Sequence, residues 1–196
     1  DGLRKHRRHR EQQSGAAREQ LPLLRGSVRV VSLMVDPSDA EVNELVAAVS
    51  PDFIQLHGKE TPARVAAIAA LSGRPIVKAI AVADAADLVR AHAYEDMADY
   101  LLFDAKADQG ATRPGGLGAA FDWQLLKGRI FRRPWGLAGG LTPLNVARAI
   151  EIAEPHFVDA SSGVEDSPGV KSRDKIAGFV RAARNAQYTD RNAGAA

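Results

Sequence analysis

Short apolar runs recur along the chain from residue 28 onward, and segments with a different periodicity separate them. Near-continuous hydrophobicity over a short run is typical of a parallel strand that is covered on both faces. The runs are residues 28–35, 52–58, 75–80, 99–105, 134–140 and 156–162. We therefore expect a buried strand at each of them.

Between the runs, apolar residues are spaced three and four apart, which places them on one face of an α-helix. This spacing covers residues 42–49, 146–153 and 176–183. Three helix starts also carry a capping residue, followed either by a glutamate three positions later or by a proline suited to the first turn. These signals are Ser38 with Glu41, Thr61 with Pro62, and Thr142 with Pro143. Residues 121–126 are a shorter and weaker helical pattern.

Strands and helices that alternate strictly predict parallel strands joined by right-handed crossovers. An open doubly wound sheet and a closed (β/α)8 barrel both satisfy this order. Only six units are visible, whereas a closed barrel needs eight strands. The first 20 residues are almost without apolar side chains, so they do not supply the missing units.

Composition indicates one globular domain with enough apolar material for a core, since 45% of the 196 residues are hydrophobic and 26% are charged. No apolar run is long enough to span a bilayer, so we expect a cytoplasmic protein without membrane contact. The pI of about 9.1 comes from the first 13 residues, which carry a net charge of +3. A basic head on a nearly neutral body favours no nucleic-acid partner, although an anion-binding tail is one alternative.

Acidic and imidazole side chains follow several of the predicted strands. Asp104 comes directly after four large apolar residues, and His57 and Asp159 also end their runs. Because the carboxyl ends of parallel strands meet at one edge, these side chains are expected at the same rim. A single histidine at a strand end is more often a structural hydrogen-bonding group than a catalyst.

Two loops rich in glycine and serine follow the last two runs. Small residues at a strand's carboxyl end let backbone N–H groups face an anion closely. The candidate residues for a phosphate site are Gly139, Gly140, Ser161, Ser162 and Gly163. In a barrel, the loops after the last two strands are the usual phosphate site, which supports this prediction.

Six stretches, taken together and in this order, resemble the phosphoribosylanthranilate isomerases of tryptophan biosynthesis. They are QLHG (55–58), KAI (78–80), LLFDAK (101–106), GGLGAAFDW (115–123), AGGLTPLNV (138–146) and VDASSGVEDSPGVK (158–171). The resemblance implies a (β/α)8 barrel of which this chain holds strands three to eight. It also implies an Amadori rearrangement of N-(5'-phosphoribosyl)anthranilate without metal or organic cofactor, by an enzyme that is a monomer or a homodimer.

By the same resemblance, Asp104 is the general acid that protonates the ring oxygen of the substrate. Gly140, Ser161 and Ser162 would bind the phosphate through backbone N–H groups, with Asp159 facing the same pocket. We expect an N-terminal segment at residues 1–27 that is disordered or partly helical, an incomplete barrel domain at 28–187 and a flexible tail at 188–196.

The chain departs from the family at its beginning. The family's first strand carries a cysteine as general base and a Ser-Pro-Arg stretch follows its second strand, but the sequence contains no cysteine and no such stretch. We therefore expect a chain that lacks the first two βα units of the family. Two alternatives stay open: an inactive barrel fragment that binds phosphorylated ligands, and another sugar-phosphate isomerase or epimerase on the same kind of barrel.

Overall fold

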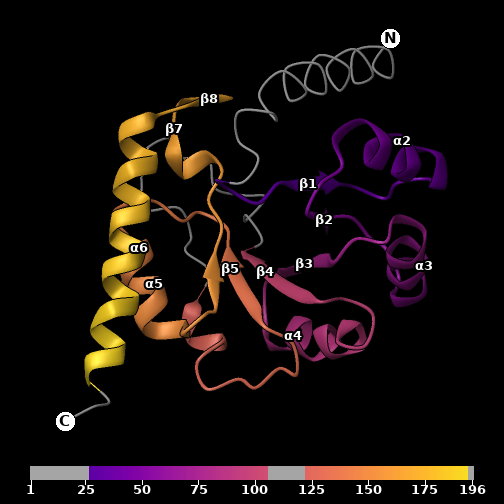
Figure 1. Cartoon of the computed structure of the whole chain (residues 1–196). Helices are drawn as coiled ribbons and strands as arrows, with labels where there is room; N and C mark the ends of the chain where they lie inside the picture. Colours follow the sequence, from indigo (N-terminus) through magenta and orange to yellow (C-terminus); the bar gives the residue numbers. More distant parts are fainter. Residues whose placement is uncertain (1–26, 106–121, 194–196) are drawn as a thin grey trace. The chain divides into compact units, whose positions relative to one another are not determined.

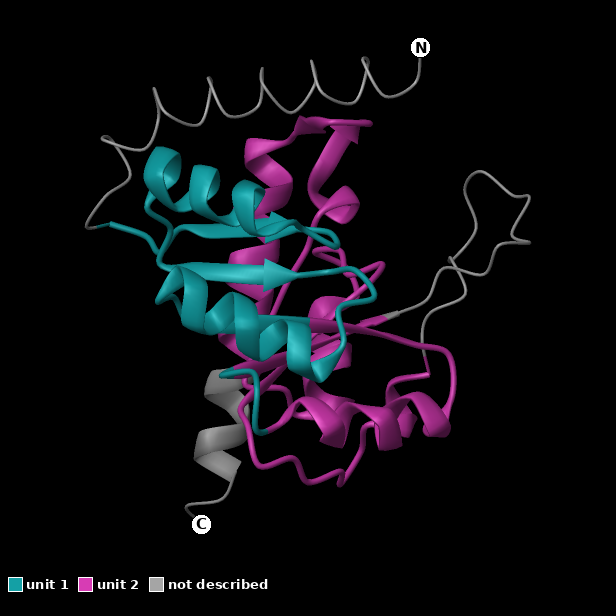
Figure 2. Cartoon of the chain, turned by 90° about the vertical axis from the view of Figure 1, so that its right-hand side faces the viewer, with its two compact units in different colours: residues 1–78, 96–99 teal, residues 79–95, 100–196 magenta. Residues whose placement is uncertain are grey.

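The computed structural model describes residues 27–105 and 122–193 (Figure 1). Parts of the sequence interpreted above lie outside these residues: the basic head, the stretch GGLGAAF, Lys106 and the last three residues. The chain divides into two compact units, Asp1–Lys78 with Asp96–Asp99 and Ala79–Glu95 with Tyr100–Ala196 (Figure 2). Among the described residues, none of the helices combines the length and the apolar character needed to cross a bilayer.

Unit 1 contains three parallel strand segments and two helices. The strands are β1 (Val31–Met34), β2 (Phe53–Leu56) and the start of β3 (Ile76–Val82), with β2 paired to both others. The helices are α2 (Asp39–Val49) and α3 (Pro62–Ser72). Both predicted helix starts are confirmed, because Ser38 and Glu41 form a capping box and Thr61 caps a helix with proline in its first turn.

The core of unit 1 comes from apolar residues of its strands and helices. Val42, Ile54, Leu56, Val65, Ile68 and Ile76 have no exposed surface. The prediction that 28–35 is a buried strand is wrong in part, because Val31 and Leu33 are about half exposed. Among the described strands, β1 pairs with β2 alone, so one of its edges gains no cover from another described strand.

Unit 2 contains the end of β3, three further parallel strands, a hairpin and the longest helix among the described residues. Its remaining elements are α4 (Ala85–Ala91), η1 (His92–Tyr94), β4 (Tyr100–Ala105), η2 (Trp123–Leu125), β5 (Trp135–Ala138), α5 (Val146–Ala153), β6 (Phe157–Val158), η3 (Ser162–Val164), β7 (Glu165–Ser167), β8 (Val170–Lys171) and α6 (Arg173–Ala193). β4, β5 and β6 pair in chain order and all run parallel. β7 and β8 form an antiparallel hairpin, which the sequence pattern did not predict.

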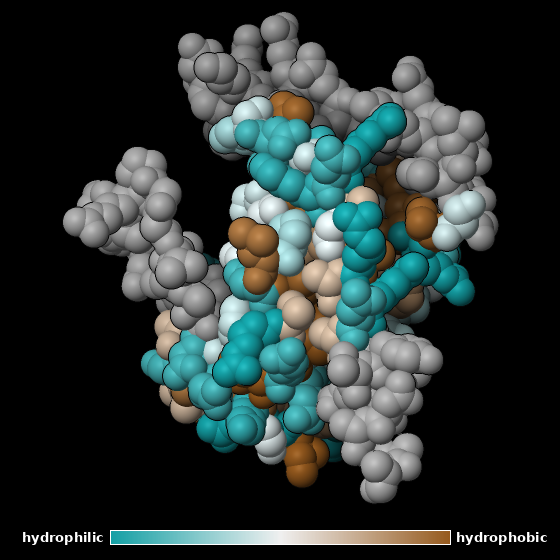
Figure 3. Space-filling model, turned by 90° about the vertical axis from the view of Figure 1, so that its left-hand side faces the viewer, coloured by the Kyte–Doolittle hydropathy of each residue, from teal (hydrophilic) through white to brown (hydrophobic). Residues whose placement is uncertain are grey.

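The surface that carries α6 is mixed in character. Figure 3 shows hydrophilic side chains over this face with apolar ones scattered between them. The exposed apolar residues of α6 include Ile176 and Val180. The buried Phe179 faces the interior of the unit, so the predicted periodicity of residues 176–183 is confirmed while its apolar face is covered only in part.

Candidate active site

Two acidic residues that the sequence singled out lie at the same level of the sheet in unit 2. Asp104 pairs with Ala138 in the register of β4 and β5, and the Asp159 N–H donates to the Leu137 carbonyl at 2.9 Å, one step beyond β6. Residues at one level of neighbouring parallel strands share a face of the sheet. With strands about 4.8 Å apart, the Cα atoms of the two aspartates lie about 10 Å from each other.

A small side chain lies between the two aspartates. Ala138 occupies the middle position at this level, on the strand that separates β4 from β6. Asp104 is half-buried and Asp159 is exposed. The arrangement therefore offers one sheltered and one solvated carboxyl group on the same face.

The level beneath the aspartates is apolar. Leu102 pairs with Gly136, which in turn pairs with Phe157. A Cβ atom at Gly136 would lie 2.3 Å from the Phe157 ring, so the ring rests directly on this glycine. Tyr100 meets the same ring edge-on at 6.0 Å between centroids. These side chains form an apolar layer directly beneath the two aspartates.

The opposite face of β4 is held by an aromatic cluster. Phe103 is fully buried, and its ring lies 4.8 Å from Phe131 and 5.5 Å from Trp135 between centroids. Because successive side chains of a strand point to opposite faces, this packing fixes Asp104 toward the other side. A catalytic group on a well-packed strand keeps its geometry better than one on a loop.

The glycines after β5 adopt a conformation that most residues avoid. Gly139 and Gly140 have φ angles of 86° and 64°, in the left-handed region that favours glycine. The Asn145 side-chain amide donates to the Gly140 carbonyl at 3.0 Å, and its oxygen accepts the Thr142 N–H at 2.7 Å. The loop therefore has a defined shape with little side-chain bulk.

The predicted helix start at Thr142 is wrong. α5 begins only at Val146, after a turn at residues 143–145. The Thr142 hydroxyl accepts the Leu144 N–H at 3.2 Å, which closes a tight turn instead of capping a helix. The positive end of the helix therefore starts three residues later than the sequence suggested.

The second predicted phosphate loop lies against the first. A Cβ atom at Gly163 would fall 1.9 Å from the Leu141 carbonyl oxygen, so only glycine fits at this contact. Ser161 and Ser162 are exposed, and Ser162 opens the short helix η3. The structure thus brings the residues after β5 and those after β6 into one place, beside the level of Asp104 and Asp159.

Two charged residues beside this loop were missed at the sequence level. Lys171, in β8, donates from Nζ to the Ser161 carbonyl at 2.9 Å, to Ser161 Oγ at 3.3 Å and to Glu165 Oε1 at 2.7 Å. The bonds from Lys171 and from the Gly169 N–H lower the pKa of Glu165. Both residues lie within the stretch VDASSGVEDSPGVK (158–171), but no periodicity connects either of them to the loop.

His57 belongs to unit 1, where it follows β2. Its backbone N–H donates to the Met34 carbonyl at 2.9 Å and its side chain is half-buried. The carbonyls on either side, of Leu56 and Gly58, accept from Lys78 Nζ at 3.3 and 2.9 Å. These hydrogen bonds therefore hold the backbone around His57 in place. His57 belongs to unit 1, whereas Asp104 belongs to unit 2.

A buried ion pair supports the same loop of unit 1. Lys78 Nζ lies 2.7 Å from Glu60 Oε2, and Glu60 also accepts from the N–H groups of Asp36 and Gly58. Burial by itself would raise the pKa of Glu60, but the bond from Lys78 and the backbone N–H groups of Asp36 and of Glu60 itself lower it overall. Glu60 is thus held as a carboxylate inside the unit.

Within the part of the chain that the structure describes, no three or more His, Cys, Asp and Glu side chains gather in a way that could hold a metal ion.

Comparison with known proteins places the chain in one family. A profile described as "PRAI: N-(5'phosphoribosyl)anthranilate (PRA) isomerase" matches residues 4–182. The N-(5'-phosphoribosyl)anthranilate isomerase of Paramagnetospirillum magneticum is 50% identical over 159 residues, which are 81% of this chain and 74% of that protein.

Solved structures agree with the sequence match. The phosphoribosyl anthranilate isomerase of Thermotoga maritima has a TM-score of 0.76 and 32% identity, over 88% of this chain and 80% of its own. Another solved isomerase, in complex with reduced 1-(o-carboxyphenylamino)-1-deoxyribulose 5-phosphate, has a TM-score of 0.73 and 30% identity, over 88% and 79% of the two chains. A further T. maritima structure shows monomers made from the dimeric isomerase. The chain belongs to the N-(5'-phosphoribosyl)anthranilate isomerase family, whose members are isomerases of tryptophan biosynthesis built on the (β/α)8 barrel.

Proposed function

We propose that this chain binds N-(5'-phosphoribosyl)anthranilate at the carboxyl ends of β4, β5 and β6 and isomerises it to the carboxyphenylamino-deoxyribulose phosphate. The observation that carries the proposal is the placement of Asp104 at one level with Asp159, beside two glycine and serine loops that touch through Gly163 and Leu141. An acid and an anion site on neighbouring strands suit a phosphorylated sugar whose ring must open.

The phosphate is proposed to bind the N–H groups of Gly139, Gly140 and residues 161–163. Backbone donors of this kind suit an anion, and the positive φ angles of the two glycines leave no side chain in the way. With the phosphate fixed at these loops, the sugar ring would extend across Ala138 toward the two aspartates.

Asp104 is proposed as the general acid. As the C1'–O bond breaks, its proton passes to the ring oxygen while the anilino nitrogen donates its electron pair to C1'. Removal of the proton at C2' then yields the enolamine, and its tautomerisation gives the ketone. Asp159 is proposed to orient the sugar hydroxyls. These 196 residues include no cysteine that could serve as the base at C2'.

A second candidate function follows from that absence. A barrel that lacks the family's base could bind the phosphorylated ligand without isomerising it, since a general base contributes about 10²–10⁴ in rate. Both candidates use the same phosphate loops, and they differ only in turnover. His57 enters neither as a catalyst, and its proposed part is a contact with substrate.

We further propose a cytoplasmic protein, a monomer or homodimer, that works without a nucleic-acid or membrane partner. The dimeric relative from T. maritima supports the oligomeric part of this proposal. Within the chain we propose a separate segment at 1–27, an incomplete barrel domain at 28–187 and a tail at 188–196, with α6 continuing through the start of that tail to Ala193.

Complementation of a tryptophan auxotroph that lacks this isomerase tests the function. Growth with the wild-type chain, and no growth with Asp104→Ala at equal soluble expression, would support an isomerase that uses Asp104. No growth with soluble wild-type protein would favour the second candidate. A full-length relative serves as the positive control.

A further inference from the structure

One peptide group of the proposed phosphate loop is held by an unusual pair of donors. The Ser161 carbonyl accepts the Val164 N–H at 3.3 Å within η3 and the Lys171 ammonium at 2.9 Å from β8. The ammonium also reaches Ser161 Oγ at 3.3 Å. A charged donor therefore holds both the carbonyl and the hydroxyl of this residue.

The orientation of the next N–H follows from this contact. A peptide bond is planar and trans, so its C=O and its N–H point in opposite directions. Since the Ser161 carbonyl points at Lys171, the Ser162 N–H points away from the hairpin. A cation on the carbonyl also polarises the peptide and strengthens its N–H as a donor.

The hairpin holds the ammonium in place before any ligand binds. Glu165 Oε1 accepts from Lys171 Nζ at 2.7 Å, while Glu165 Oε2 accepts the Gly169 N–H at 3.1 Å. These contacts lie within β7, β8 and the turn between them, so they form whenever the hairpin forms. Lys171 is therefore restrained by its own element and reaches across to the loop.

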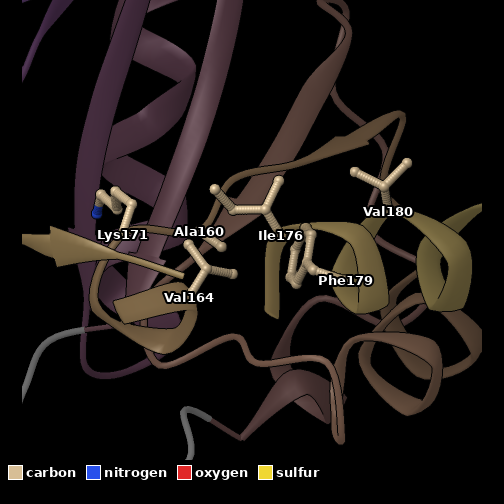
Figure 4. A pocket seen from close by; sticks show the side chains of 6 residues that line it. All are labelled: Ala160, Val164, Lys171, Ile176, Phe179 and Val180. Carbon is tan, nitrogen blue, oxygen red and sulfur yellow. The ribbon is translucent and has the colours of Figure 1, made fainter. Parts of the chain in front are cut away.

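The other side of the loop rests on an apolar wall. Ala160 and Val164 line a small cavity of about 230 Å³ together with Ile176, Phe179 and Val180 of α6, and the Lys171 side chain borders it (Figure 4). The Figure shows the Lys171 ammonium at the end away from these α6 side chains. Apolar packing sets the depth of the loop but does not set the rotation of the Ser161–Ser162 peptide plane. That rotation depends on the two donors to the Ser161 carbonyl, the Val164 N–H and the Lys171 ammonium, and Lys171 is the charged one.

We propose that Lys171 is a positioning residue for phosphate binding, which turns the Ser161–Ser162 peptide so that the Ser162 N–H faces the anion. This inference rests on the proposed phosphate site. It adds a residue whose role is neither to touch the reacting atoms nor to pack the fold, and it makes the β7–β8 hairpin part of the binding apparatus.

The test uses ribose 5-phosphate as the probe and follows backbone amide signals of the full chain. Lys171→Met should weaken the affinity about fivefold to tenfold, which is the effect of losing about one hydrogen bond. The Ser162 amide signal should move in the free protein and respond less to the probe. Lys171→Arg, which keeps a charged donor, should restore most of the affinity.

Lys175 provides the matched control. It contacts the same glutamate, with Nζ 2.6 Å from the Glu165 carbonyl, but it does not bond to Ser161 in the described contacts. The affinity of Lys175→Met for ribose 5-phosphate should therefore stay within about twofold of the wild-type affinity. An equal loss in both variants would mean a general effect of charge and would overturn the inference.

Two further outcomes also decide against the inference. If wild type binds ribose 5-phosphate and Lys171→Met binds it equally well, the positioning role is wrong while the phosphate site stands. If wild type binds no phosphorylated probe, the proposed site and this inference both fall. Lys171→Gln, with thermal unfolding measured for every variant, separates a loss of folding from a loss of binding.

Discussion

Two lysine–glutamate pairs hold two loops at the carboxyl ends of strands, one in each unit. Lys78 with Glu60 and Lys171 with Glu165 have the same N–O distance of 2.7 Å, and each lysine also donates to loop carbonyls. The side chains of the first pair are 3% and 1% exposed, and those of the second are 46% and 16% exposed. The contacts are alike and the surroundings differ.

The difference predicts different roles. Removing one partner of a buried pair leaves an uncompensated charge in a place that water cannot reach, which typically costs about 3–5 kcal/mol. An exposed pair is screened by solvent and contributes about 0–1 kcal/mol. The pair in unit 1 should therefore control whether the unit folds, whereas the pair in unit 2 is free to serve binding at little cost in stability.

Lys78→Met should give the largest effect. It leaves Glu60 buried beside apolar atoms, so the free energy of unfolding should fall by about 3–5 kcal/mol. Urea unfolding measures this loss, and the double variant Lys78→Met with Glu60→Gln should recover part of it because no charge is left behind. If the free energy of unfolding of Lys78→Met fell by less than about 1 kcal/mol, the two pairs would not differ in their contribution to stability, and the prediction would be wrong.

Gly163→Ala should give the second-largest loss of stability. Its Cβ would fall 1.9 Å from the Leu141 carbonyl, and a backbone atom cannot move aside as a flexible side chain can. Overpacking of this kind costs about 1–3 kcal/mol, and separating the two loops should weaken phosphate binding as well. Ser162→Ala, at the exposed neighbour, is the control for stability. Unchanged stability and binding in Gly163→Ala would mean that the loops need not touch.

The contribution of the Lys78–Glu60 pair to stability should depend on pH. The pKa of Glu60 is lowered in the folded chain from the ordinary 4.5, so its contribution to stability is present above about that pH and is lost as the pH falls through the folded value. Urea midpoints from about pH 6 to about pH 3 measure this, with Glu60→Gln as the reference. Equal pH dependence in wild type and Glu60→Gln would contradict the assignment.

Lys171→Met should give the smallest effect on stability. Because the Lys171 side chain is 46% exposed and solvent screens its charge, the free energy of unfolding should change by less than about 1 kcal/mol. Thermal and urea unfolding of this variant beside Lys78→Met make the comparison direct. A loss as large as that of Lys78→Met would show that the hairpin supports the fold and not only the loop.

Local signals in the sequence predicted much of the fold. The apolar runs located all six parallel strands, and Ser38 and Thr61 marked two helix starts correctly. Strand positions and helix starts of this kind depend on residues that are close together in the sequence, so a periodic pattern can predict them. Thr142 failed because it lies in a turn that precedes the helix: its hydroxyl accepts the Leu144 N–H, its own N–H donates to the Asn145 side chain, and Asn145 is the residue that precedes α5.

The parts of the site that depend on distant contacts could not be predicted in this way. Lys78 and Glu60 are 18 residues apart, and Lys171 of β8 contacts Ser161 of the loop that precedes the hairpin. Neither contact follows a periodic spacing in the sequence. Glycine and serine in the two loops pointed to an anion site, but only the structure shows that Gly163 lies against Leu141. The sequence therefore predicted which loops carry the candidate N–H donors, whereas the direction of these donors depends on packing.

The most direct test of the proposed function is the rate at which purified wild type and Asp104→Asn convert N-(5'-phosphoribosyl)anthranilate. Loss of the general acid should lower kcat by about 10²–10⁴, while the affinity for a phosphorylated analogue stays the same, since the phosphate loops are untouched. Equal rates in the two proteins, or a lost rate that comes only from lost binding, would contradict the role of Asp104 at the carboxyl end of β4.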